Sequence, residues 1–179
     1  HQEAVMLTPV ERLAAKADGK QWELVENQRG ITYYKLFGPY LAGAKKIVVE
    51  DAYVRKPYQL RNLAEFLEML LRCKNPDEDV AVHLVTGHNE PEFVDAQLNG
   101  LNELASTFSQ LGVNLTYEFR DTLHDRSITS DTGWEILPGR GLDIFQKFVD
   151  GDWLNPLLRH QQLRRVKECK VTYRRISEK

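Results

Sequence analysis

The alternation of apolar strands with amphipathic helices in the middle of the chain restricts the fold more than any other sequence feature. Short runs rich in β-branched residues alternate with longer segments in which leucine and phenylalanine recur at helical spacing. The predicted strands are 45–51, 80–86 and 113–119, and the predicted helices are 57–72 and 89–111. Strands that are joined by helical crossovers pair in parallel, so this region predicts an α/β layer.

The pattern changes after residue 119. Short strands are expected at 126–130 and 134–137, and the Asp-Thr-Gly sequence at 131–133 predicts a tight hairpin turn that makes them antiparallel. A last strand, 166–175, carries several cationic side chains. We expect this strand at the edge of the sheet, with the cations on its solvent-exposed side. The predicted fold class is α/β, with one mixed sheet flanked by helices.

The 179 residues, of which 42% are hydrophobic, suffice for one substantial core. Thr8, Pro9 and Glu11 have the form of a helix start, so residues 1–20 are predicted to be an N-terminal helix or linker. Residues 21–179 are predicted to be the folded domain.

The net charge of −2 argues against a general nucleic-acid coat protein. Cys73 and Cys169 lack metal-type spacing and predict reduced thiols, which fits a cytoplasmic location. No apolar run reaches the roughly 20 residues that a membrane-spanning helix needs. Nothing in the sequence calls for a metal or another cofactor.

The segment from His124 to Asp143 contains the residues best suited to phosphate chemistry. In an extended strand, His124 and Arg126 would point to the same side of the sheet. Neutral imidazole can attack phosphorus, a guanidinium can hold two phosphate oxygens, and a carboxylate such as Asp131 can orient the imidazole. These three residues are the candidate catalytic set.

A second group of candidate residues follows the first predicted strand. Asp51, Tyr53 and Arg55 come just past its carboxyl end, where open α/β sheets bind ligands. Arg55 and Tyr53 would add charge and stacking to a pocket, and Arg140 would face the same space. A structural role, in which Asp51 fixes the loop, stays open. His83, inside a hydrophobic strand, is interpreted as a core histidine.

The spacing His-x-Arg-x-x-x-x-Asp resembles the phospholipase D signature, in which lysine replaces the arginine. Gly139 falls where that superfamily has a Gly-Ser pair, but Arg140 stands in place of the serine. The superfamily joins two such motifs, and none of His83, His88 and His160 is followed by the required cation. Catalysis as a phosphodiesterase would therefore need a homodimer.

A closer resemblance covers nearly the whole chain, to the phospholipase D-like domain at the C-terminus of MIT-domain-containing proteins. The segments that carry it are 50–55, 82–86, 124–126, 133–136 and 139–145. Similar segments are found at the C-termini of bacterial Lon-type proteases of BREX phage-defence systems. The sequences of segments 36–41 and 131–134 resemble those bacterial forms. The resemblance implies a non-catalytic domain, since the animal members bind acidic lipid head groups during membrane scission.

Three hypotheses follow from the sequence and its resemblance. The first is a non-catalytic module that recognises a protein partner or a phosphate-bearing ligand as part of a larger protein. The second is a dimeric, metal-independent phosphodiesterase or nuclease with His124 as nucleophile. The third is a domain that binds acidic lipid, which nothing in the composition favours over the first.

Overall fold

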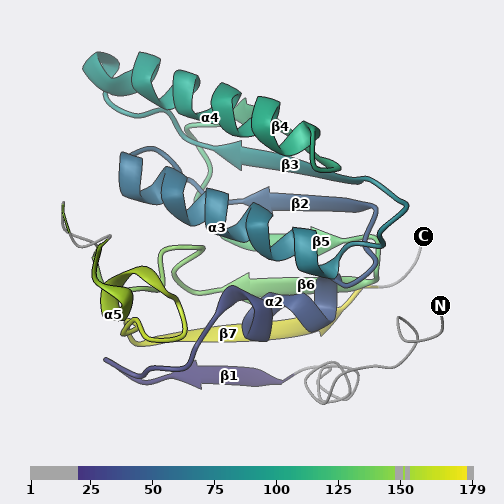
Figure 1. Cartoon of the computed structure of the whole chain (residues 1–179), viewed down its shortest axis with the longest axis vertical. Coiled ribbons are helices and arrows are strands. Elements are labelled where there is room, and N and C mark those ends of the chain that lie inside the picture. The colour runs from purple at the N-terminus through teal and green to yellow at the C-terminus, as the bar shows by residue number, and fades with distance from the viewer. Residues whose placement is uncertain (1–19, 148–150, 152–153, 177–179) are drawn as a thin grey trace.

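The computed structural model describes residues 20–147, 151 and 154–176. Their strands form one seven-stranded mixed sheet. The strands are β1 (Gln21–Leu24), β2 (Lys46–Glu50), β3 (Val80–Thr86), β4 (Val113–Phe119), β5 (Ser127–Ser130), β6 (Trp134–Pro138) and β7 (Cys169–Arg175). Their order across the sheet is β1-β7-β6-β5-β2-β3-β4 (Figure 1). The predicted α/β class is confirmed.

The parallel half of the sheet forms as the alternation of strands and helices predicts. β2 pairs with β3 and β3 with β4, both in parallel. The crossovers are α3 (Pro57–Cys73) and α4 (Val94–Ser109), the latter preceded by a short 3-10 turn, Pro91–Phe93. The leucine and phenylalanine stripe of α3 is buried, because this helix packs its apolar side on the sheet.

The antiparallel half contains the predicted hairpin and one departure from prediction. β5 pairs with β2 and with β6, both antiparallel, so the hairpin at 131–133 is confirmed. The last strand is not an edge strand, because β7 lies between β6 and β1. β1 pairs with the edge of β7 that would otherwise be exposed. The edge strands of the sheet are β1 and β4.

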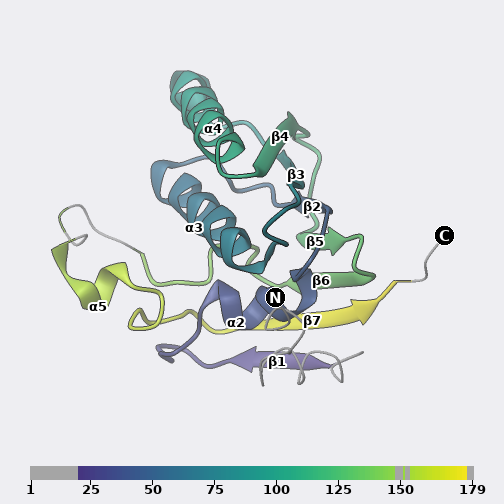
Figure 2. The same cartoon turned by 45° about the vertical axis from the view of Figure 1, so that its right-hand side comes forward.

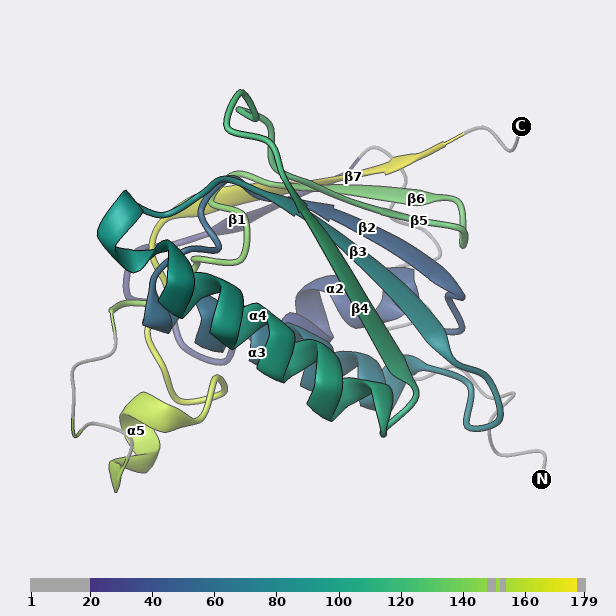
Figure 3. The same ribbon diagram turned by 90° about the horizontal axis from the view of Figure 1, so that it is seen from above.

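The long helices lie on one face of the sheet. Figure 3 shows α2 (Tyr33–Leu41), α3 and α4 together beneath the strands, with no helix of the described residues above them. Residues at alternate strand positions, such as Ile47, Val82 and Ile128, are buried on this side. The sequence predicts helices on the faces of the sheet, and the structure places these three helices on one face.

The other face of the sheet carries mostly polar and short side chains. His83 lies there, half exposed, and its ring nitrogens contact the Thr116 hydroxyl at 2.7 Å and the Glu118 carboxylate at 2.9 Å. The interpretation of His83 as a core histidine is therefore wrong. A histidine in an apolar strand is buried only if its face of the sheet is covered, and this face is not.

The helix or linker predicted within residues 1–20 lies almost wholly outside the described residues. The short helix α5 (Pro156–Arg159) lies to one side of the sheet (Figure 2). Cys73 and Cys169 are half-buried thiols. Among the described residues, no helix has the length and apolar character needed to cross a membrane.

Candidate functional site

Four chain segments meet at one edge of the sheet because of the strand directions. β2 ends there, and β5 begins there because it runs antiparallel to β2, with Glu50 opposite Ser127. β6 also ends at this edge, and β7 begins beside it. The residues just outside these strands therefore come together, although they are far apart in the sequence.

Asp51 anchors the loop that follows β6. Its side chain is buried, and its two oxygens accept hydrogen bonds from the N–H groups of Tyr53 at 3.0 Å and Leu142 at 3.1 Å. Burial raises the pKa of Asp51 above its usual value, against the opposing effects of these two donors and of the nearby Arg126 charge. Asp51 therefore has a structural role in holding the loop, and this is the role that the sequence left open as an alternative to ligand binding.

Gly141 is required by this arrangement. Its φ of +62° lies in the left-handed region, and a Cβ on it would come within 2.1 Å of an Asp51 carboxylate oxygen. Only glycine lets the backbone pass this close to the buried carboxylate. The two residues therefore depend on each other.

Arg126 lies immediately before β5 and points toward the loop. Its guanidinium donates to the carbonyl of Gly139 at 3.0 Å and lies 5.1 Å from the centre of the Tyr53 ring. Arg55 contacts the same ring at 4.9 Å and donates to the carbonyl of Ala52 at 2.7 Å. The half-exposed Tyr53 ring thus receives two cationic groups, each oriented by a backbone carbonyl.

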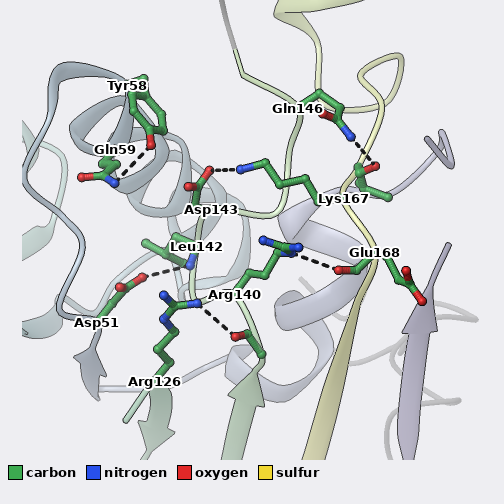
Figure 4. A network of polar contacts seen from close by, with 12 residues as sticks. Asp51, Tyr58, Gln59, Arg126, Arg140, Leu142, Asp143, Gln146, Lys167 and Glu168 are labelled. Atoms are coloured by element: carbon green, nitrogen blue, oxygen red, sulfur yellow. Dashed lines mark hydrogen bonds and ion pairs between the residues drawn. The ribbon is translucent and has the colours of Figure 1, made fainter. Parts of the chain in front are cut away.

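Arg140 and Asp143 complete the site from the loop after β6. The Arg140 guanidinium donates to the carbonyl of Glu168 at 2.9 Å, and Asp143 accepts from Lys167 at 3.1 Å. Figure 4 shows Arg126 and Arg140 on neighbouring segments, with the Arg140 guanidinium directed toward Glu168. They line a pocket of about 190 Å³ together with the following residues: Tyr53, Gln59 and Asp143.

His124 does not line this pocket. The strand begins at Ser127, so the alternation of side chains that was expected to align His124 with Arg126 does not apply. His124 is an exposed residue of the segment 120–126, which rises above the open face of the sheet (Figure 3). Leu123 holds that segment in place by packing with Ala52 and Val85.

Asp131 is remote from Arg126 because the two residues flank opposite ends of β5. Its carboxylate accepts from the Lys45 N–H at 3.0 Å, and its own N–H donates to the carbonyl of Lys46. Asp131 therefore joins the hairpin turn to the start of β2. The predicted closeness of Asp131 to Arg126 is wrong, since the intervening residues are fully extended.

The remaining histidines of the described residues also lie elsewhere. His88 follows β3 and contacts the Asp121 carboxylate at 2.9 Å, while its ring stacks on Phe119. His160 follows α5. Among the described residues, no group of three His, Cys, Asp or Glu side chains is arranged to hold a metal ion.

Sequence reasoning missed Gln59, Asp143 and Lys167 as parts of this edge. Gln59 lies in the first turn of α3, which follows β2, and its position after the strand was the available signal. Asp143 fell within the segment singled out for phosphate chemistry but was given no role. Lys167 carries no local signal, because only the pairing of β7 with β6 brings it to the site.

Comparison with known proteins relates the sequence of this chain to one family. Residues 30–175 match the protein family described as the phospholipase D-like domain at the C-terminus of MIT. The chain is 38% identical over 136 residues to mouse (Mus musculus) MIT domain-containing protein 1, an alignment that covers 74% of this chain and 54% of the relative. The chain thus spans about half the length of that relative. The match takes in the whole region from α2 to β7, so the chain belongs to the family of phospholipase D-like domains found at the C-terminus of MIT proteins.

Proposed function

We propose that this domain is a non-catalytic recognition module that binds phosphate-bearing ligands in the pocket between Arg126 and Arg140. The observation that carries the proposal is that Arg126 and Arg140 both line a pocket of about 190 Å³ and that each guanidinium group is oriented by a backbone carbonyl. Guanidinium groups form charge-assisted hydrogen bonds with phosphate oxygens. Because both are already oriented, binding costs little side-chain entropy.

The position of the histidines supports binding rather than catalysis. Phosphoryl transfer by imidazole requires the ring to reach the phosphorus atom, yet no histidine is among the residues that line the described pocket. Arg140 further supports this reading. It brings a bulky cation to the place where the phospholipase D superfamily has a small hydroxyl residue.

The domain is proposed to work as the C-terminal part of a larger protein. The chain spans about half of its curated relative, and its family is described by its place at the end of MIT proteins. The resemblance of 36–41 and 131–134 to bacterial forms favours a Lon-type protease of phage defence as the larger protein. Partner proteins and acidic lipids are two sources of the phosphate group that the pocket would recognise.

Calorimetric titration with inositol hexakisphosphate tests the pocket. Arg126→Ala and Arg140→Ala should each weaken binding by about tenfold or more, because a hydrogen bond to a charged group contributes roughly 1.5–3 kcal/mol. Arg174→Ala removes an exposed arginine paired with Glu135 on the open face and is the matched control. It should bind as the parent does.

Flotation with vesicles of acidic and of neutral lipid tests whether the phosphate group that the pocket binds belongs to a lipid head group or to a soluble ligand. Binding to inositol hexakisphosphate without flotation would assign a soluble ligand, whereas flotation that depends on acidic lipid and on Arg126 would assign a head group. Equal affinity of the parent and both pocket variants for the soluble probe would refute the pocket.

A further inference from the structure

A further concave surface lies next to the anion pocket, between the beginnings of α3 and α4. It is a groove of about 730 Å³. Arg55 of this surface contacts the Tyr53 ring of the anion pocket at 4.9 Å, and Gln59 of the anion pocket donates to the Tyr58 hydroxyl of this surface at 3.3 Å. The two helices run side by side over the sheet (Figure 1), and none of the described residues lines both the groove and the anion pocket.

The close approach of the two helices limits the groove in one direction. A Cβ on Gly100 of α4 would lie 2.7 Å from a Leu60 methyl carbon of α3, so glycine permits this contact. Nearer the helix starts, the smaller Ala96 and the half-exposed Phe93 line the open space. Pro57, Tyr58 and Leu60 provide the apolar surface on the α3 side.

The two amide side chains of the groove are already used within the chain. Gln97 donates to the carbonyls of Val54 and Gly87 and accepts from the Asn89 N–H. Asn89 donates through its amide to the carbonyl of Arg55 and accepts from the Glu90 N–H. These amides therefore serve to hold the segment after β3, and the rest of the lining consists of apolar carbon and charged groups.

Those charged groups are mainly cationic. Among the residues that the structure describes, Arg55, Lys56, Arg61 and Lys147 line the groove with one carboxylate, that of Glu90. This local excess of positive charge contrasts with the net charge of −2 of the whole chain. Lys147 also lies 5.6 Å from the centre of the Tyr58 ring, so a cation and an aromatic surface are adjacent.

We propose that the groove between α3 and α4 is a docking site for an acidic peptide segment of a partner protein, with one or two apolar side chains inserted between carboxylates. The apolar side chains of the peptide would pack on Leu60, Ala96 and Phe93, and its carboxylates would face the cationic side chains of the groove. Sequence-specific recognition of a nucleic acid fits less well, because Asn89 and Gln97, the amide side chains of the described lining, already bind backbone groups of this chain.

Selection from a display library of short random peptides tests the proposal with the intact chain. Selected peptides should contain leucine, phenylalanine or tryptophan flanked by aspartate or glutamate. Ala96→Glu places a carboxylate in the groove near the start of α4, where the helix dipole favours acidic residues, so the fold is retained. We expect this variant to weaken the selected peptides by at least about tenfold, measured by fluorescence anisotropy.

Ser106→Glu adds the same charge to an exposed position of α4 outside the groove and should bind as the parent does. Arg126→Ala should also leave peptide binding unchanged, which separates this site from the proposed anion pocket. Selection of basic peptides, no selection at all, or equal binding by Ala96→Glu would overturn the proposal. So would tighter, Ala96-dependent binding of a single-stranded oligouridylate, or Ala96-dependent self-association seen by light scattering.

Discussion

At the scale of single residues, Asp51 determines how the site is built. Its carboxylate joins the end of β2 to Leu142, 91 positions later in the chain, and Gly141 leaves space for it. The Tyr33 hydroxyl donates to the carbonyl of the same Leu142, so both backbone groups of that residue have side-chain partners. A buried carboxylate that satisfies two backbone donors fixes the loop from which Arg140 and Asp143 extend.

Asp51→Asn should destabilise the domain by about 1–3 kcal/mol, because an amide has one acceptor oxygen for two N–H groups. The stability difference should also depend on pH. The folded pKa of Asp51 is raised by burial, so the folded state binds its proton more tightly, and this contribution to stability is lost as the pH rises through the folded pKa.

Urea denaturation from about pH 3.5 to about pH 7 should therefore show the advantage of the parent over Asp51→Asn shrinking as the pH rises. Asp77→Asn, which removes one negative charge from an exposed turn, is the matched control. An advantage that grows with pH would mean that the hydrogen bonds to Tyr53 and Leu142 outweigh the effect of burial.

At the scale of elements, the hairpin of β5 and β6 separates residues that are close in the sequence. Arg126 precedes β5 and Asp131 follows it, so the extended strand carries them to opposite ends of the sheet. The same strand directions bring Asp51, Arg126 and Arg140 together from three different segments. The spacing of a motif along the chain therefore predicts proximity only when the secondary structure between its members is known.

Asp131→Ala should lower stability by roughly 1 kcal/mol, since the Lys45 N–H loses its acceptor at an exposed position. The affinity for inositol hexakisphosphate should not change, because Asp131 lies far from Arg126. Urea denaturation and calorimetry on the same sample measure both quantities. A loss of affinity with unchanged stability would show that Asp131 acts in the anion site after all.

At the scale of the whole molecule, coverage of one face of the sheet divides the strand residues into two environments. Val48 and Val49 are neighbours in β2, yet their exposed fractions are 37% and 1%. Val49 points to the helices and Val48 to the open face. The division is a consequence of the period of two along a strand, once the helices occupy a single side.

Val49→Thr should cost about 1–3 kcal/mol, because it buries a hydroxyl group among apolar side chains. Val48→Thr is the matched substitution on the open face and should change stability by less than about 0.5 kcal/mol. Chemical denaturation of the two variants gives both values. Equal, large losses would indicate that the open face is covered in solution, for example by a second copy of the chain.

The sequence was informative wherever the signal is local. The periodic leucines of α3 and the alternation of strands with helices predict an α/β layer, because each depends on residues close in the chain. The Asp-Thr-Gly turn predicts the antiparallel hairpin for the same reason. Arg126 and Arg140 were identified as candidates, and both line the pocket.

The sequence by itself thus determined the class of fold, the parallel core and the cations available for an anion site. Only the tertiary structure decided that β7 is internal, that His83 faces solvent, and that His124 stands away from the pocket. The physical reason is that these features depend on contacts between distant segments. A short-range pattern records which side chains share a face, but not what covers that face or which strand lies beside it.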